Sequence, residues 1–302
     1  MKKILVLITV ATVLFSSGCL EGIIGSKSTV TSYGVVVNEF GPDFSELESG
    51  DKFDLYLEIE NTGGAKATDV WAHLYDFDRK SEEFGELDPP DEEAGIPGEV
   101  KDVTWEEIAP DNPEGVVYTY TPRVRLMYDY KTIATANLPL LTKTEYKRLK
   151  ERNQLNIPPI TTEVSKGPVA VEISARAPIV IEDFDEDTVD FRINIDLLGR
   201  GTVFNSSHSN SDFNLNDDEL DKVTLKITAL GIEGAATDEN GNSLCDAYDT
   251  EKEIDMRKGK TYTYSCELNA SNFAATKTIP VTVELDYGYF EDYSTTITVR
   301  GK

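Results

Sequence analysis

The chain has 302 residues, of which 55 are acidic and 29 basic, and its net charge is −26. A surface this acidic repels phosphate groups, so the composition argues against a nucleic-acid partner and against a protein that lies flat on an anionic membrane. At about 150 residues per domain, the length predicts two domains.

The N-terminus has the pattern of an exported lipoprotein. A lysine pair precedes an apolar run from Ile4 to Phe15, which is too short to cross a bilayer but matches a secretory signal. The residues before Cys19 resemble a lipobox, although Ser16 stands where an aliphatic residue is usual. We expect a signal peptide over 1–18, lipidation of Cys19 and a tether over 19–30, which would anchor the protein in the membrane at the extracellular face of the cell. The alternative is an ordinary signal peptide that ends near a cysteine.

The clearest strand pattern lies in the first predicted domain, residues 31–142. Its apolar positions lie on either side of the turn Asn61-Thr62-Gly63-Gly64: Phe53, Leu55, Leu57 and Ile59 before it, and Val70, Ala72 and Leu74 after it. A period of two indicates strands with one buried face. Further strands are expected at Tyr33–Val37, Val100–Ile108, Val116–Tyr120, Arg123–Tyr130 and Thr132–Leu141.

The stretch Ser49–Phe77 also carries a family resemblance. A glycine, four alternating apolar residues, Asn-x-Gly and then Val-x-Ala-x-Leu resemble the immunoglobulin-like CARDB modules of bacterial and archaeal surface proteins. The resemblance implies an extracellular β-sandwich that is related to adhesion. It brings no catalytic residue with it.

The second alternating run predicts a row of large side chains opposite its buried face: Trp71, His73, Tyr75 and Phe77. Exposed aromatic side chains in a row often mark a binding surface, so this row is the candidate binding face. On that hypothesis, replacing Trp71 and Tyr75 by alanine removes partner capture and leaves the thermal midpoint almost unchanged. Alternatively, the acidic loop at 79–99 or the neighbouring domain covers the row.

Residues 143–166 are predicted to connect the two domains. Thr142-x-x-Glu145 has the form of a capping box, helix formers continue to Leu155, and Pro158-Pro159 ends the helix. The helix is rich in lysine and arginine and could dock an acidic partner, although such a face is more often only solvated.

The second predicted domain, residues 167–302, repeats features of the first. An alternating run from Val189 to Leu197 is followed by Gly199-Arg200-Gly201, and Val283–Tyr289 resembles Val124–Tyr130. We expect each of these tyrosine-rich segments to form a hairpin that closes its own sandwich. The predicted fold is therefore all-β: two tandem immunoglobulin-like β-sandwiches joined by a short helical connector and preceded by a signal peptide.

With Cys19 assigned to lipid, Cys245 and Cys266 remain as a pair in an oxidising compartment. A disulfide between them is expected, and two free buried thiols are the alternative. The spacing gives little support to zinc or redox chemistry.

The sequence points to no catalytic or cofactor site. His73 lies on a strand and His208 in a polar loop, and the chain has no nucleophile, metalloprotease or phosphate-loop motif. One loop has oxygen donors at calcium-like spacing, but its sixth position is Ser243 rather than glycine and its flanks predict strands, which favours a hairpin turn with an acidic rim. The donors are Asp238, Asn240, Asn242, Asp246 and Asp249. Asn205 and Asn269 begin glycosylation sequons.

These observations favour a non-enzymatic surface lipoprotein that acts in adhesion or as an envelope scaffold by binding a protein or a glycan. The alternative is a ligand-binding or accessory component of a transporter or of an extracellular hydrolase system.

Overall fold

The structure, a computed structural model, describes residues 34–184, 187–232, 234–256, 261–270 and 272–302. The expected signal peptide, Cys19 and the tether lie outside the described residues. Within these residues the chain forms eighteen strands and one helix, which confirms the all-β prediction. In the same part of the chain, no helix combines the length and apolar character needed to cross a membrane.

The first region is built on a three-stranded antiparallel sheet in the order β1-β3-β6. The alternation predicted around Leu55 is observed, because every second side chain of β3 is buried. Strands β4 and β5 contribute the facing buried side chains, among them Val70, Ala72 and Leu74. The bounds are Val35–Pro42 for β1, Lys52–Asn61 for β3, Ala67–Tyr75 for β4, Lys80–Leu87 for β5 and Val100–Ile108 for β6.

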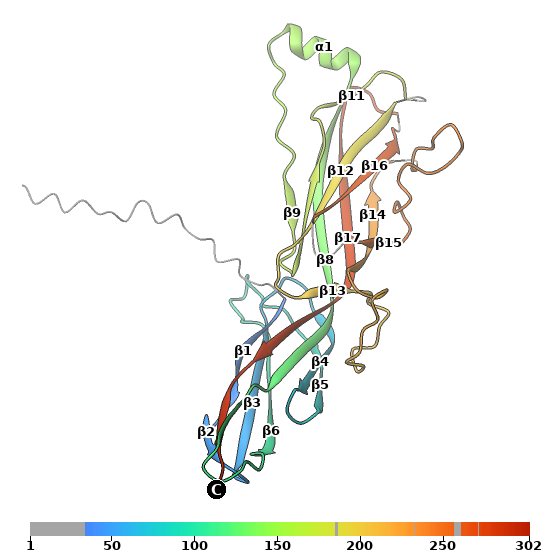
Figure 1. Cartoon of the computed structure of the whole chain (residues 1–302). Coiled ribbons are helices and arrows are strands. Elements are labelled where there is room, and N and C mark those ends of the chain that lie inside the picture. Colours follow the sequence, from blue (N-terminus) through green and yellow to red (C-terminus); the bar gives the residue numbers. More distant parts are fainter. Residues whose placement is uncertain (1–33, 185–186, 233, 257–260, 271) are drawn as a thin grey trace, which may run out of the picture. The chain divides into compact units, whose positions relative to one another are not determined.

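Two long antiparallel strands run through the whole described body. They are β8, Arg123–Thr142, and β17, Thr276–Ser294. They pair without interruption over nineteen residue pairs, from Arg123↔Ser294 to Leu141↔Thr276. At about 3.4 Å per residue this ladder is roughly 60 Å long. Figure 1 shows it as the green and red strands that join the lower and upper elements.

The second region uses the other half of the same ladder. Strand β14, Lys222–Ala229, pairs with β17, and β15, Lys252–Asp255, pairs with β14. A separate antiparallel sheet in the order β10-β12-β16 contributes further buried positions. Its bounds are Val169–Ser174 for β10, Thr188–Leu197 for β12 and Tyr262–Asn269 for β16. Short strands pair along the ladder: β9, Thr162–Val164, and β11, Ile179–Ile181, on β8, and β13, Thr202–Phe204, on β17.

The end of the chain returns to the first region. Strand β18, Ile297–Arg300, pairs with β2, Glu46–Glu48, and with β7, Val117–Tyr120. The predicted domain boundaries follow chain order, whereas β17 and β18 place the last residues beside strands from both halves of the sequence. Residues 32–302 accordingly form one compact unit.

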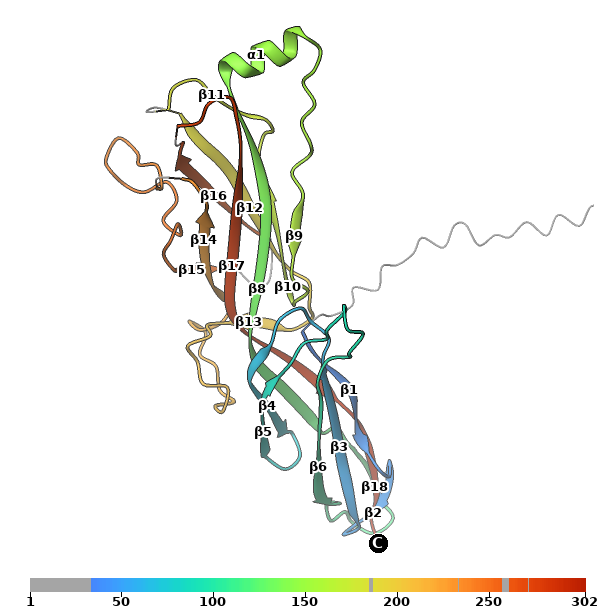
Figure 2. The same ribbon diagram turned by 180° about the vertical axis from the view of Figure 1, so that it is seen from behind.

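The predicted helix forms as α1, Lys143–Glu151, and Thr142 is its N-cap, accepting a hydrogen bond from the Glu145 backbone. It lies in the connection from β8 to β9, two strands that pair with each other in one sheet. Figures 1 and 2 both show it at the end of β8.

The predicted tyrosine-rich hairpins are wrong. Arg123–Tyr130 and Thr132–Leu141 are one continuous strand, and the two similar segments pair with each other, with Tyr130 opposite Tyr287 and Tyr128 opposite Tyr289. All four tyrosines are buried at the midpoint of the ladder. The residue pattern predicts that these segments are strands, but it does not predict which strand pairs with which.

Candidate functional site

The predicted row on β4 lies where a segment from the second region crosses the first. A β-bulge interrupts β4 between Ala67 and Val70 in its pairing with β5 and between Thr68 and Trp71 in its pairing with β8, and Asp69 adopts a φ of +48°. A bulge redirects the side chains around it. Asp69 consequently accepts hydrogen bonds from Nε1 of Trp71 (2.9 Å) and from the backbone N–H of Asn210 (3.0 Å).

Asn210 joins the two regions from a fully buried position. Its Nδ2 donates to the carbonyl of Asp69 (2.9 Å) and to Oδ1 of Asp129 on β8 (3.2 Å). Its carbonyl lies 2.7 Å from Nε2 of His73, so Nε2 carries the proton and Nδ1 accepts from the Ser81 hydroxyl at 2.8 Å. A single amide residue therefore satisfies groups on β4 and β8.

The ionisation of this network follows its burial. His73 is 3% exposed, and burial lowers its pKa, although the bond to the Asn210 carbonyl opposes the effect. Burial raises the pKa of Asp129 to about 7. The negative charge of nearby Asp69 also raises this pKa, whereas the hydrogen bond from Asn210 lowers it. Near neutral pH, His73 is therefore neutral and Asp129 is about half protonated.

Phe213 covers the outer part of the row. Its ring lies 5.1 Å from Tyr75 and 5.9 Å, edge to face, from His73. The guanidinium of Arg125 lies between Phe213 (4.6 Å) and Phe290 (4.2 Å), and it also forms a two-pronged ion pair with Asp292. The segment that carries Asn210 and Phe213, which we call the crossing loop (residues 205–221), is therefore fastened to the row by packing and charge.

The row is consequently not an open surface in this structure. His73 and Tyr75 contact the crossing loop through Asn210 and Phe213, and Trp71 stacks on His73. Ser81, within the 79–99 segment, also bonds to His73. Phe77 has left the row, because Asp76 adopts a φ of +59° and breaks the alternation. Phe77 instead packs on the core.

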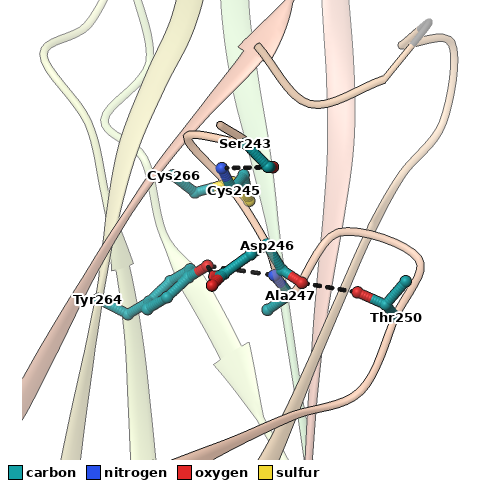
Figure 3. Close-up of a disulfide and its surroundings, with 7 residues drawn as sticks. All are labelled: Ser243, Cys245, Asp246, Ala247, Thr250, Tyr264 and Cys266. Atoms are coloured by element: carbon teal, nitrogen blue, oxygen red, sulfur yellow. Dashed lines mark hydrogen bonds between the residues drawn. A yellow bond between two sulfur atoms is a disulfide. The ribbon is translucent and has the colours of Figure 1, made fainter. Parts of the chain in front are cut away.

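The disulfide between Cys245 and Cys266 forms as expected, and both cysteines are buried. Figure 3 shows it beside Tyr264, whose hydroxyl donates to the Asp246 carboxylate and accepts from the backbone N–H of Ala247 (3.1 Å). The disulfide thus ties β16 to the loop that precedes β15.

The calcium-like loop uses its oxygens internally. Asp238 accepts from the backbone N–H groups of Asn240 (2.8 Å) and Asn242 (2.9 Å), as in a tight turn. Asp246 is held by Tyr264 and by Lys252. Asp249 adopts a φ of +53°. Across the described residues, no three His, Cys, Asp or Glu side chains gather in a way that could hold a metal ion.

The two sequon asparagines lie in different settings. Nδ2 of Asn205 donates to Glu253 at 2.7 Å, and Nδ2 of Asn269 donates to the carbonyl of Ala235 at 3.2 Å. Asn205 is half-buried and Asn269 is exposed at the end of β16. Ser271 of the second sequon lies outside the described residues.

His208, the other histidine, stabilises the crossing loop. Its ring nitrogens lie 3.0 Å from the Glu219 carboxylate and 3.0 Å from the Asp212 carbonyl. Although burial opposes it, these two partners raise the pKa of His208. The sequence does not predict Asn210 or Phe213 as site residues, because a polar loop carries no periodic signal.

No family model matches the chain, and no curated protein matches it. Among solved structures, a red sea bream transglutaminase is 9% identical over 87% of this chain, with a TM-score of 0.20, and the chain spans only 31% of that enzyme's length. The collagen adhesin (CNA) of S. aureus is 10% identical, with 88% of this chain and 92% of the adhesin covered and a TM-score of 0.12. At these TM-scores neither similarity supports a conclusion about fold or function.

Proposed function

We propose that this protein is a non-enzymatic lipoprotein, anchored through Cys19 at the extracellular face of the cell membrane, that acts in adhesion or as an envelope scaffold by binding a protein or a glycan. In this proposal the two regions are immunoglobulin-like β-sandwiches of the CARDB type, and they present their sheet faces and loops to the partner.

The observation that carries the proposal is the shared ladder. Nineteen consecutive pairs join β8 to β17, with the first region on one half and the second region on the other. A hinge between two sandwiches would need a break in this pairing. The uninterrupted ladder therefore supports a body that holds its surfaces at a fixed spacing, as a scaffold or an adhesin requires.

The disulfide supports the placement outside the cytoplasm. Cys245 and Cys266 are the two cysteines that remain once Cys19 is assigned to lipid, and they are bonded to each other. Structural disulfides persist in oxidising compartments and are rare in reducing ones. This observation agrees with a secretory signal at residues 1–18.

The test uses intact cells that express the full chain, with Cys19→Ser as the matched variant. We expect externally added protease to degrade the wild-type protein, a lipid label to enter the wild type but not Cys19→Ser, and crosslinking on intact cells to capture a surface protein or glycan. Retention of residues 1–18 in a cytosolic form would overturn the placement. Capture of a permease or a hydrolase as the main partner would overturn the function in favour of an accessory component.

A further inference from the structure

A cavity of about 480 Å³ opens at the side of the first region, between the edge strands β5 and β6. Its walls come from the turn between β4 and β5, from the end of β6 and from Tyr120 on β7. Phe77 thus lines this cavity, whereas His73 and Tyr75 contact the crossing loop.

Glu107 occupies a position in β6 that the strand period reserves for the core. Trp105 and Glu107 are both buried, whereas Thr104, Glu106 and Ile108 between and beside them are exposed. The Glu107 side chain is only 4% exposed and lines the cavity. A buried carboxylate is costly unless a cation accompanies it, so this residue points to a positive partner.

The resident cation satisfies Glu107 incompletely. Nζ of Lys80 lies 2.8 Å from Oε1 of Glu107 at an angle outside hydrogen-bond geometry, and it donates a hydrogen bond to the carbonyl of Glu106 at 2.6 Å. From the described part of the chain, no donor reaches Oε1 in hydrogen-bond geometry. Lys80 is itself one-third exposed, so it can swing towards solvent while Glu107 stays in place.

The remaining walls suit a cation with an apolar stem. The Phe77 ring is held edge to face by Phe53 (5.7 Å) and Tyr120 (6.1 Å), and aromatic rings attract cations. Asp76, Asp78, Glu106 and Glu107 contribute four carboxylates to the lining, and Lys80 is the one cation among the described residues there. The lining is therefore acidic, aromatic and partly apolar at once.

We propose that this cavity binds an organic cation, a primary ammonium or a guanidinium, with Glu107 as its counter-ion and with Phe77 and Tyr120 as aromatic walls. The ligand displaces the ammonium of Lys80 from Glu107. Two sources share this chemistry: a lysine or arginine side chain of a partner protein, and a free polyamine. The site does not depend on membrane anchoring, so its failure and the failure of the proposed function are separate results.

The purified full chain is titrated with n-butylammonium and n-butylguanidinium, with n-butanol as the uncharged match, and binding is followed by NMR. We expect both cations to bind at least about tenfold more tightly than butanol, because the aromatic rings and the carboxylate attract a cation but not an uncharged alcohol. Spermidine and a blocked Gly-Lys-Gly peptide then distinguish a free polyamine from a protein side chain, through which of the two binds more tightly.

Three variants give the proposal a signature that a purely structural ion pair lacks. Lys80→Met removes the competing cation and should tighten ligand binding severalfold. Glu107→Gln should abolish binding, and Phe77→Leu, which keeps the apolar packing, should weaken it about fivefold. Glu82→Gln on β5, an exposed acid outside the cavity, is the control and should change nothing.

Lys80→Met is the most informative variant, because it keeps the Glu107 carboxylate and tests the proposal even where Glu107→Gln fails to fold. Weaker or unchanged binding of the ammonium in Lys80→Met would overturn the proposal. Equal binding of butanol and butylammonium by the wild-type protein would overturn it as well.

Discussion

The first and second regions attach to the ladder by matching turns. In the first region Gly63 packs against Tyr130, and in the second Gly199 and Gly201 pack against Tyr289. The Tyr130 hydroxyl accepts from the Ala65 backbone at 3.0 Å, and the Tyr289 hydroxyl accepts from the Gly201 backbone at 2.7 Å. A tyrosine hydroxyl thus holds one glycine turn on β8 and another on β17.

The regions differ in what else secures them. The second region has the disulfide between Cys245 and Cys266, and it sends the crossing loop over the aromatic row of the first. The first region has no cysteine among its described residues and receives Asn210 and Phe213 from outside itself. Both regions therefore hold a glycine turn on a ladder tyrosine, whereas the disulfide and the crossing loop are additional links that come from the second region alone.

The largest expected effect tests the matching turns. An alanine Cβ would lie 1.8 Å from the Tyr130 hydroxyl at Gly63 and 2.0 Å from the Phe290 carbonyl at Gly201. Gly63→Ala and Gly201→Ala should therefore each lower the free energy of unfolding by more than about 3 kcal/mol. Gly41→Ala, which meets only a Thr295 hydroxyl at 3.9 Å, is the control in urea denaturation. A much smaller loss of unfolding free energy in one of the two variants would show that the two turns are not equivalent.

The next effect tests whether the disulfide of the second region stabilises both regions together. Replacing Cys245 and Cys266 together by serine should cost about 3 kcal/mol, as expected for a loop of this length. Because β8 and β17 belong to both regions, calorimetry should still show one transition at a lower midpoint. Two separated transitions would show that the regions unfold independently.

A smaller effect tests the link that the first region receives. Asn210→Ala removes the donors to Asp69 and Asp129 in a buried setting, which should cost about 2 kcal/mol. Hydrogen exchange should rise in β4, and Asn214→Ala, an exposed residue of the same loop, should leave it unchanged. Equal protection of β4 in both variants would contradict the role of Asn210.

The smallest effect concerns pH. The pKa of Asp129 is raised to about 7, so the folded state holds a proton that the unfolded state releases near pH 4. Stability from this group is complete below about pH 4 and is lost as the pH rises through 7. Asp129→Asn does not lose this stability, because an asparagine side chain does not ionise in this pH range. Its melting temperature relative to the wild type should therefore rise between pH 4 and pH 8, by about 3 °C after allowance for partial exposure. A constant difference across that range would contradict the assignment.

Strand alternation made much of the fold predictable. The buried positions of β3 and β4 and the capped start of α1 follow from short-range patterns, and the pairing of Cys245 with Cys266 follows from the number of cysteines. The ladder could not be predicted in the same way, because two similar strands 150 residues apart carry no mark that identifies their partner.

The candidate sites likewise include some residues that the sequence could predict and others that it could not. The cover over His73 and Tyr75 comes from a polar loop whose buried asparagine resembles its solvated neighbours in sequence. Glu107, in contrast, could have been found, because an acid follows Trp105 at an inward position of an alternating strand. Breaks in a pattern are visible in a sequence, whereas contacts made by patternless segments are not.

The late position of β17 and β18 in the chain has a consequence for synthesis. Both regions need strands from the last thirty residues, so neither can complete its sheets until translation is nearly finished. Contacts between residues so distant in sequence form slowly. A polypeptide with this contact order stays incompletely paired during synthesis and closes its sheets only after β17 and β18 have been made.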